Sequence, residues 1–395
     1  MKLIDYSRKM LIANRSEIAI RIARTASAMG IRTCAVYPDD DAASRHVAAA
    51  DWAVRIPGRG AAAYLDKAEI VEAAMREGCD LIHPGYGFLS ENAEFADLCT
   101  QNGLLFIGPS GAALKALGDK ARARGIARRI GVPLVEGLDE VSGEETLTAF
   151  FDAQKGRSGI VIKAVSGGGG RGIRIVRDRS QIAQALSSCR AEALAAFGDG
   201  EVYVERLIER ARHVEVQVVA DGGGTVRHLW NRECSLQRRN QKIIEIAPSP
   251  WLPADVEAAM LADACRLVGA VEYVGLATVE FLYDVDRGDY AFMEVNPRIQ
   301  VEHTVTEEVL GLDLVGIQVA VCVGASLKDL GLAAQDIPRP REIAIQARVN
   351  AEIMAADGTA SPATGVIRHY DPPGGPRVRV DGAGWACALA EARAM

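Results

Sequence analysis

The sequence lacks the features of several broad classes of protein. Its eight cysteines are scattered, with no CxxC pair and no spacing of metal ligands, so neither a disulfide framework nor a zinc site is expected. The most apolar stretch, residues 314–327, is interrupted by Gln318 and is shorter than the ~18 residues of a membrane-spanning helix. Basic residues are not in excess, since 45 Lys and Arg against 52 Asp and Glu give a net charge of −7. Membrane insertion and nonspecific nucleic-acid binding are therefore not expected.

Signals for targeting and for common nucleotide sites are also missing. The N-terminus has no apolar core followed by a small-residue cleavage site, so we expect no signal peptide and a cytoplasmic protein. The first expected strand leads into Asn14-Arg15-Ser16 instead of GxGxxG, which weakens the case for a nicotinamide-dependent enzyme. No GxxxxGK[ST] loop is present, so a Walker-type phosphate site is excluded.

What is present predicts a mixed α/β protein. The chain has 395 residues, of which 49% are hydrophobic, and this is enough for two or three domains with sizeable cores. Up to about residue 118, short apolar runs typical of strands alternate with segments of helical spacing. The expected strands are 9–13, 33–37, 80–83 and 104–108, and the expected helices are 16–29, 66–77 and 92–102, capped by Ser16, Asp66 and Asn92. Such alternation is typical of a parallel sheet covered on both faces.

The rest of the chain has a different pattern. Helices are expected over 120–130 and 253–269, and strands around 159–164 and within 202–230 and 277–296. A final segment begins at Glu342 and opens with an alternating strand that contains Arg348.

The first chemical signal is a run of four glycines, 167–170, between Lys163 and Arg171. Successive glycine N–H groups can form an anion-binding nest, and the two flanking cations would add positive charge. A mobile flap over phosphates fits this pattern. The alternative is a flexible surface turn without a ligand.

The second signal is a hairpin expected over 278–296, with a turn centred on Arg287. In this register Glu280 would face Glu294, and the repulsion between the two carboxylates would be removed by a divalent cation. Asn296 projects on the same face and would supply a third oxygen, which is the donor type that Mg²⁺ prefers. The alternative is a different register with two unconnected surface glutamates.

Polar groups cluster at three further places. Arg298 would clamp an anion and Glu302 would act as a general base, just after the hairpin. The run 237–242 is basic, and either binds anions or forms a solvated face. His213 and Glu215 alternate on one strand face, and His213 has either a site role or a structural one. Cys234 lies among polar residues, but no motif supplies it with a base, so we do not expect a nucleophile.

Eight segments of the sequence together resemble the biotin carboxylase family. The resemblance runs from residue 9 to about 352 and rests on IANRSEIAIRI, HPGYGFLSEN, GDK, IKAVSGGGGRGIR, RHVEVQV, ECSLQRRNQK, NPRIQVEH and ARVNAE. It implies an α/β fold, α+β overall, in three parts. These are a Rossmann-like pre-ATP-grasp domain at 1–118, an ATP-grasp domain at 119–330 with a mobile glycine-rich lid at about 135–205, and a C-terminal biotin carboxylase domain at 331–395.

The resemblance also implies the chemistry. ATP and bicarbonate would form carboxyphosphate and ADP, and the carboxyl group would then move to N1′ of carrier-bound biotin, which makes the protein a ligase that forms a C–N bond. Mg²⁺, or Mn²⁺ in its place, would assist. The implied partners are a biotin carboxyl carrier protein or domain and a carboxyltransferase subunit, and a complete C-terminal domain would favour a homodimer.

The site residues follow by motif. Phosphate-binding positions are Lys120, Lys163, Gly169 and Gly170. The adenine site would be lined by Glu205, Arg206 and Ile208, and the ribose and phosphates would be approached by His213 and Asn240. Mg²⁺ would be held by Glu280, Glu294 and Asn296. Bicarbonate would be bound by Lys242, Arg298, Gln300 and Val301 and deprotonated by Glu302, and Arg348 would stabilise the biotin enolate oxygen.

The sequence departs from the family at three places. Asn240 stands where many members have His, and we expect altered nucleotide contacts without loss of activity. Val165-Ser166 replaces a more glycine-rich start of the flap. After Asp381 the sequence no longer follows the family, so we expect a truncated C-terminal domain. Two alternatives to an active biotin carboxylase are therefore a folded, silent ATP-binding fragment and another ATP-grasp ligase that uses an amine nucleophile.

Overall fold

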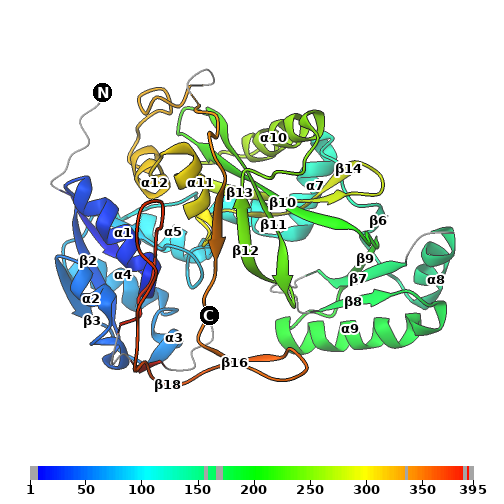
Figure 1. Ribbon diagram of the computed structural model, residues 1–395, viewed down its shortest axis with the longest axis horizontal. Helices are drawn as coiled ribbons and strands as arrows, with labels where there is room; N and C mark the ends of the chain where they lie inside the picture. Colours follow the sequence, from blue (N-terminus) through cyan, green and yellow to red (C-terminus); the bar gives the residue numbers. More distant parts are fainter. Residues whose placement is uncertain (1–7, 155–158, 166–171, 334–336, 386–388, 391–395) are drawn as a thin grey trace.

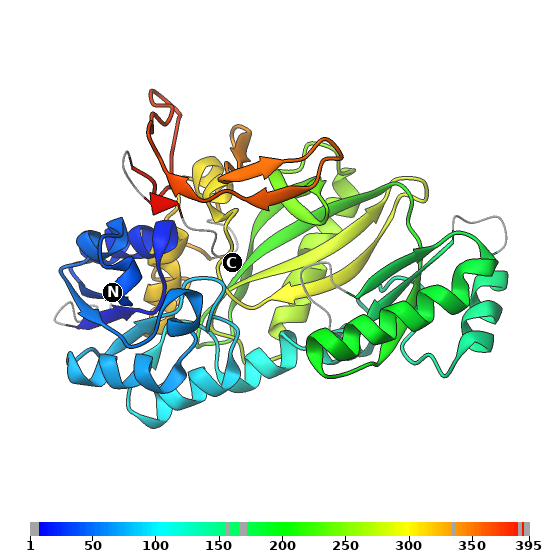
Figure 2. The ribbon, with the colours of Figure 1, turned by 90° about the horizontal axis from the view of Figure 1, so that it is seen from below.

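The structure is a computed structural model that describes residues 8–154, 159–165, 172–333, 337–385 and 389–390. Figure 1 shows three parts side by side: an N-terminal α/β unit, a large central sheet, and a smaller sheet with two helices at the far end. The C-terminal segment lies along one side of the molecule, across the N-terminal unit and the central sheet (Figure 2). No helix in the described ranges is long and apolar enough to cross a membrane.

The N-terminal unit contains a parallel sheet of order β3-β2-β1-β4-β5. Its strands are β1 (Lys9–Ile12), β2 (Arg32–Tyr37), β3 (Trp52–Arg55), β4 (Leu81–His83) and β5 (Leu105–Phe106). Its helices are α1 (Ser16–Ala28), α2 (Arg45–Ala49), α3 (Gly60–Ala63), α4 (Lys67–Arg76), α5 (Ala93–Gln101) and α6 (Gly111–Leu117), with a 3₁₀ turn η1 at Asp39–Asp41. The predicted strands and long helices are confirmed within a few residues, whereas β3 was not predicted.

The predicted helix caps are confirmed at two of three positions. Asp66 and Asn92 accept hydrogen bonds from the backbone N–H groups of Glu69 and Phe95. Ser16 is not a cap: it is the first residue of α1, and Arg15 precedes it as the N-cap without a side-chain bond. The prediction for Ser16 is wrong because the strand-to-helix connection is tight and places Ser16 at φ +61° inside the helix.

The central sheet has the order β14-β13-β10-β11-β12-β15 and is antiparallel. Its strands are β10 (Ala211–Ala220), β11 (Val226–Arg238), β12 (Gln241–Ala247), β13 (Gly275–Asp284), β14 (Asp289–Asn296) and β15 (Ala344–Ala347). One face packs on helices α7 (Lys120–Ile130) and α10 (Ala254–Gly269) through an apolar core that includes Val216, Val279 and Leu267. The other face carries polar side chains.

Two helices connect the central sheet to the N-terminal unit. These are α11 (His303–Leu310) and α12 (Leu314–Cys322). Leu314 and Val319 share one buried core with Ile12 and Ile22 of the N-terminal unit. Val305 and Leu310 of α11 belong to the same core, which holds α11 against both sheets.

The smaller unit has a sheet of order β6-β9-β7-β8. It comprises β6 (Gly137–Leu138), β7 (Ile160–Ala164), β8 (Ile173–Val176), β9 (Val202–Arg206), α8 (Glu144–Ala153), α9 (Ile182–Phe197) and the 3₁₀ turn η2 (Arg179–Gln181). A separate small core, which includes Leu147, Ile162 and Val204, holds it together. The C-terminal segment adds the short strands β16 (Glu352–Met354), β17 (Ala360–Pro362), β18 (Gly365–Val366) and β19 (Leu389–Ala390).

Candidate active site

The two predicted metal-binding glutamates face each other across the β13–β14 hairpin. Glu280 pairs with Glu294, as predicted. The turn is centred half a residue before Arg287, and a bulge between Glu280 and Phe281 restores the predicted pairing. Without this bulge the two carboxylates would project from opposite faces of the sheet.

Protein cations already balance both glutamates. Lys120 Nζ lies 2.9 Å from Glu294 Oε2. Glu280 has two partners, since Lys242 Nζ lies 2.9 Å from its Oε1 and His213 Nε2 lies 2.9 Å from its Oε2. The repulsion that the sequence predicted between the two carboxylates is therefore offset within the protein itself.

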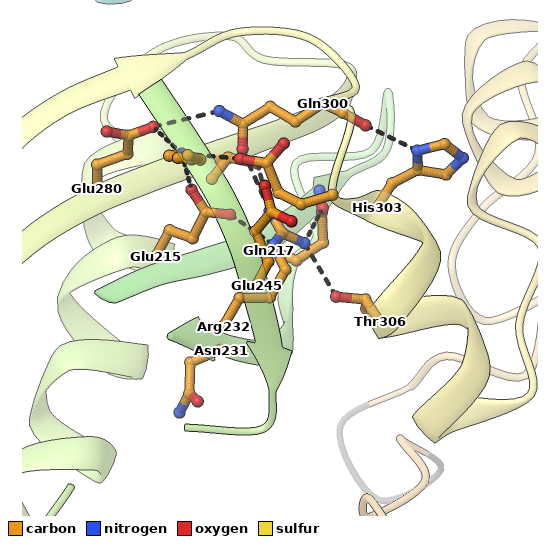
Figure 3. A network of polar contacts seen from close by, with 12 residues as sticks. Glu215, Gln217, Asn231, Arg232, Glu245, Glu280, Gln300, His303 and Thr306 are labelled. Carbon is orange, nitrogen blue, oxygen red and sulfur yellow. Dashed lines mark hydrogen bonds and ion pairs between the residues drawn. The ribbon is translucent and has the colours of Figure 1, made fainter. Parts of the chain in front are cut away.

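Lys242 joins three carboxylates of a polar network, part of which, with Glu215 and Glu280, is labelled in Figure 3. Its ammonium group donates to Glu215 Oε2 at 2.6 Å, Glu280 Oε1 at 2.9 Å and Glu302 Oε1 at 2.7 Å. These three carboxylates come from β10, β13 and the start of α11. Lys242 itself lies on β12, so a single ammonium group joins four elements of the fold.

This network shifts the proton affinities of its members. Burial alone would lower the pKa of Lys242, but the surrounding carboxylates hold it well above its ordinary value. Burial would raise the pKa of Glu280, and Lys242 and His213 instead lower it. Glu215 is also buried, and Lys242 and Arg232 lower its pKa to about 2. The lysine and both glutamates are therefore charged at neutral pH.

His213 is oriented on both sides of its ring. Gln237 Nε2 lies 3.1 Å from Nδ1, and Glu280 lies at Nε2. Burial lowers the pKa of His213, but Glu280 more than compensates and raises it overall. The site role predicted for His213 is thus consistent with its position beside Glu280.

The predicted base, Glu302, is the N-cap of α11 and is 2% exposed. Its Oε2 accepts from Arg348 Nη2 at 2.9 Å, and Arg348 Nε donates to Glu245 Oε1 at 2.6 Å. Arg348 and Glu302, both singled out in the sequence, are therefore in direct contact. Glu352, four positions after Arg348, pairs with Arg238 instead.

The loop between β14 and α11 carries the other predicted anion ligands. Gln300 donates from Nε2 to Glu280 Oε1 at 3.2 Å and is buried, and Val301 next to it is partly exposed. Asn296 donates from Nδ2 to the same Glu280 oxygen at 2.9 Å. Arg298 donates from Nη2 to Asn296 Oδ1 at 3.1 Å.

Arg298 also connects the site to the N-terminal unit. Its Nε donates to Glu91, which belongs to the HPGYGFLSEN segment. The sequence predicted a site role for Arg298 but gave none to Glu91.

The predicted phosphate-binding lysines lie toward the smaller unit. Lys163, at the end of β7, pairs with Glu205 on β9, and Arg124 donates to the same glutamate. Arg206 Nη1 donates to Asp284 Oδ2 at 2.8 Å. A cleft of about 410 Å³ beside these residues is lined in part by Arg206, Ile208 and Leu282. It is separate from the Lys242 network, whose carboxylates do not line it.

The structure says little about the nucleotide contacts of three predicted residues. Asn240 occupies the tight turn between β11 and β12 at φ +67°, and its side chain is exposed. Gly169 and Gly170 lie outside the described residues.

The sequence missed three buried members of the network. Arg232 and Glu245 were not singled out, and Glu215 was seen only as part of a polar strand face. Arg232, Glu215 and Glu245 are all fully buried. The available signal was a charged residue at an inward-facing position of an otherwise apolar strand, which requires a partner.

Some buried side chains of the network lie close enough together to resemble the ligands of a metal site. Potential ligand atoms of Glu215, Cys234 and Glu302 lie within 4.8 Å of one another. Lys242, however, donates to both carboxylates of this group. Burial raises the pKa of the Cys234 thiol well above its ordinary value, which agrees with the prediction that it is not a nucleophile.

Comparison with known proteins identifies the family. The family model "Biotin carboxylase, N-terminal domain" matches residues 6–114, and "Carbamoyl-phosphate synthase L chain, ATP binding domain" matches residues 119–330. A biotin carboxylase–β,γ-ATP complex from Campylobacter jejuni superposes with a TM-score of 0.90 at 36% identity, covering 97% of this chain and 84% of that one. The chain belongs to the biotin carboxylase family.

Other members of the family are similar over the same length. The biotin carboxylase domain of Hydrogenobacter thermophilus 2-oxoglutarate carboxylase, solved with MgADP, ADP and bicarbonate, has a TM-score of 0.90 at 39% identity and matches 97% of this chain and 83% of that one. Pyruvate carboxylase from Aspergillus niger is 47% identical over 387 residues, which are 96% of this chain and 32% of the relative. The chain thus spans about a third of the length of that relative.

The donor chemistry of the hairpin fits the divalent cation that this family implies. Glu280, Glu294 and Asn296 carry carboxylate and amide oxygens on adjacent strands, the hard donors that Mg²⁺ binds, and the Asn296 oxygen now accepts from Arg298. Glu294 is the most accessible of the three side chains at 27% exposure, and its counter-ion Lys120 is also partly exposed. The residues of this biotin carboxylase hairpin therefore fit such an ion by donor type, with Glu294 as the most accessible carboxylate.

Proposed function

We propose that this chain carboxylates biotin with bicarbonate and ATP, the first half-reaction of a biotin-dependent acyl-CoA or pyruvate carboxylase. Bicarbonate oxygen attacks the γ-phosphorus, which gives carboxyphosphate and ADP. The carboxyl carbon then bonds to N1′ of biotin, and inorganic phosphate leaves with the electron pair of the C–O bond and takes up the N1′ proton. The observation that carries this proposal is the position of Glu302 between Lys242 and Arg348, next to Glu280.

Four groups in our proposal bind bicarbonate. Lys242 and Arg298 supply positive charge, and Gln300 and Val301 lie with Arg298 in the loop between β14 and α11. Glu302 removes the bicarbonate proton. Lys242 holds this carboxylate in place through a hydrogen bond of 2.7 Å to Oε1. A preorganised arrangement of this kind needs little movement when the anion enters.

Arg348 acts in the second step. Its guanidinium is held by Glu245 and Glu302 at a fixed place beside the anion site. A ureido oxygen that gains negative charge as N1′ becomes nucleophilic would be stabilised there.

The nucleotide lies toward the smaller unit. Lys120 and Lys163 bind its phosphates, exchanging their present partners Glu294 and Glu205 for phosphate oxygens. Arg206 and neighbouring backbone groups line the adenine site. The remaining contacts in this proposal come from backbone groups of Glu205 and Ile208, from His213 and Asn240, and from Gly169 and Gly170 in the lid.

Glu280, Glu294 and Asn296 hold Mg²⁺, with Mn²⁺ as a substitute. When bound, the ion neutralises charge on the nucleotide phosphates. The chain's own part is to present these oxygens on one face of the hairpin.

The proposed partners are a biotin carboxyl carrier protein or domain and a carboxyltransferase that selects the final acceptor. We place the domain boundaries near residues 118 and 330. The cytoplasmic location stays a prediction.

One assay separates this proposal from a silent fragment and from an amine ligase. The 395-residue chain is incubated with MgATP, with and without bicarbonate and free biotin, and ADP release is measured. Bicarbonate-dependent release that biotin stimulates supports the proposal. ATP binding without turnover, or turnover that needs an amine, contradicts it.

Two variants make the assay specific. Glu302→Gln should abolish ADP release because it removes the base. Glu94→Gln changes an exposed glutamate that pairs with Lys67 on the N-terminal unit, and it should behave as the unmodified chain.

A further inference from the structure

Arg232, in the middle of β11, is completely buried and uses every donor that it has. A guanidinium has five N–H groups. Its acceptors, with their distances, are Glu215 Oε1 (from Nε, 2.6 Å), Gln217 Oε1 (from Nη1, 2.8 Å), Thr306 Oγ1 (from Nη1, 2.9 Å), Thr278 Oγ1 (from Nη2, 3.1 Å) and Gln300 Oε1 (from Nη2, 3.2 Å). Each N–H therefore has one acceptor, and no lysine could replace this set because an ammonium has three donors.

The first of these bonds orients Lys242 through Glu215. Arg232 occupies Oε1 of the Glu215 carboxylate, and this leaves Oε2 for Lys242 at 2.6 Å. The carboxylate lies between two cations from β11 and β12. Rotation of its side chain would break both contacts, so Arg232 fixes the position from which Glu215 holds the lysine.

A second bond sets the orientation of the Gln300 amide. An amide has one oxygen acceptor and one nitrogen donor, and Arg232 binds the oxygen. The nitrogen must then point the other way, where it donates to Glu280 Oε1 at 3.2 Å. Figure 3 shows Gln300 in this position between Arg232 and Glu280.

A third bond attaches helix α11 to the sheet. Thr306 lies in the first turns of α11, whose N-cap is Glu302. Arg232, on the sheet, donates to Thr306 on α11, while Lys242 donates to Glu302 at 2.7 Å. The distance between the sheet and the predicted base therefore depends on the same buried guanidinium.

We propose that Arg232 is a positioning residue that sets the orientation of Glu215 and Gln300 and the place of α11, so that Lys242 and Glu302 are aligned for bicarbonate. It does not touch substrate. The inference rests on the proposed function, since it assigns Arg232 to that reaction. Burial would lower its pKa, but Glu215 and Glu302 raise it overall, which keeps the guanidinium charged.

The test compares Arg232→Lys with a matched control. Arg232→Lys keeps the charge and loses two donors. We expect kcat for bicarbonate-dependent ATP cleavage to fall about 10²-fold, the typical effect of misplacing reacting groups by about 1 Å. The KM for ATP should change less than about twofold, because Lys120 and Lys163 are not bonded to Arg232.

Arg21→Lys is the control. Arg21 is also buried, and it donates to Glu307 on α11 and to Asp313 and Thr25, but to none of the three carboxylates that bind Lys242. It should lower Tm by a similar amount while leaving kcat within about twofold. Equal loss of kcat in the two variants, or an unchanged kcat in Arg232→Lys, would overturn the positioning role.

A second variant and a crystal structure cover the cases in which Arg232→Lys does not fold or the unmodified chain is inactive. If Arg232→Lys does not fold, Thr306→Val removes only the bond to α11 and should lower kcat more than KM for ATP; no change in kcat would count against the proposal. A crystal structure of the folded variant gives a readout without activity. If the unmodified chain is inactive, the proposed function fails. The crystal structure of Arg232→Lys then decides the positioning role alone. Displaced Glu215 and Gln300 side chains support it, and unchanged side chains overturn it.

Discussion

Arg348 donates from Nη2 to Glu302 Oε2 over 2.9 Å, although 46 positions separate the two residues. The contact forms because β15 pairs with β12 and the chain continues the pairing through Arg348 N, which donates to Ile243 O at 2.9 Å. The other oxygen of Glu302 is bound by Lys242. One carboxylate thus connects the proposed bicarbonate site to the C-terminal segment.

This contact predicts that Arg348→Ala separates the two half-reactions. Biotin carboxylation should fall about 10²–10³-fold, because a preorganised charge at the reacting oxygen is lost. Slow bicarbonate-dependent ATP hydrolysis should continue. Labelled carbon on free biotin and ADP release are measured in parallel.

Arg377→Ala is the control, since Arg377 lies in the same C-terminal segment and its side chain is 80% exposed. It should leave both reactions unchanged. Equal loss of both reactions in Arg348→Ala would indicate a folding defect, and unchanged carboxylation would remove Arg348 from the site.

Glu294→Gln should abolish Mg²⁺-dependent turnover with little effect on stability. The variant loses one carboxylate ligand and also the contact with Lys120. Both side chains are partly exposed, so this ion pair contributes less than about 1 kcal/mol to the free energy of unfolding.

Mn²⁺ binding in the presence of ADP, followed by electron paramagnetic resonance, measures the ligand role directly. We expect weaker binding in Glu294→Gln than in the unmodified chain. Equal Mn²⁺ affinity and a normal rate would contradict the metal assignment.

Glu245 predicts a pH dependence of stability. Burial raises its pKa from 4.5 to about 7, although Arg348 opposes the shift, and its buried Oε2 accepts no hydrogen bond from a described residue. The folded chain therefore holds a proton that the unfolded chain releases. This contribution to stability is fully present below pH 4.5 and is lost as the pH rises through about 7.

Glu245→Gln cannot ionise, so it should gain stability relative to the unmodified chain as the pH rises. The change between pH 4.5 and 8 amounts to up to about 3 kcal/mol. Urea unfolding at the two pH values measures it. A difference between the two proteins that does not vary with pH would rule out the raised pKa.

Asn240 allows the nucleotide role to be tested without disturbing the fold. Arg239 and Asn240 both have positive φ in the β11–β12 turn, a conformation that glycine adopts without strain. Asn240→Gly should keep the stability and weaken ADP binding by one hydrogen bond, about 1 kcal/mol or roughly fivefold.

Arg239→Gly changes the neighbouring turn position and should leave ADP affinity unchanged. Isothermal titration of both variants distinguishes them. Unchanged affinity in Asn240→Gly would place this residue outside the nucleotide site.

Much of the fold and of the site was predictable because its signals are local. Strand and helix spacing identified the N-terminal sheet, and the hairpin turn placed Glu280 opposite Glu294. The edge strand β3 was missed because its side chains are only half buried and give no clear alternation.

The counter-ions were not predictable. Lys242 meets carboxylates that are 27, 38 and 60 positions away, and no local pattern encodes such pairings. The same holds for Lys120 beside Glu294. Arg232 could be recognised only as a charge at an inward position, and its five acceptors depend on the tertiary fold.

The most direct test of the central claim follows oxygen from bicarbonate. The chain is incubated with MgATP, free biotin and bicarbonate labelled with ¹⁸O and ¹³C. If carboxyphosphate forms, the bridging oxygen stays with phosphorus when the carboxyl group leaves. We predict one ¹⁸O in each inorganic phosphate together with ¹³C on biotin. Phosphate whose new oxygen comes only from water, with no labelled biotin, would contradict the account.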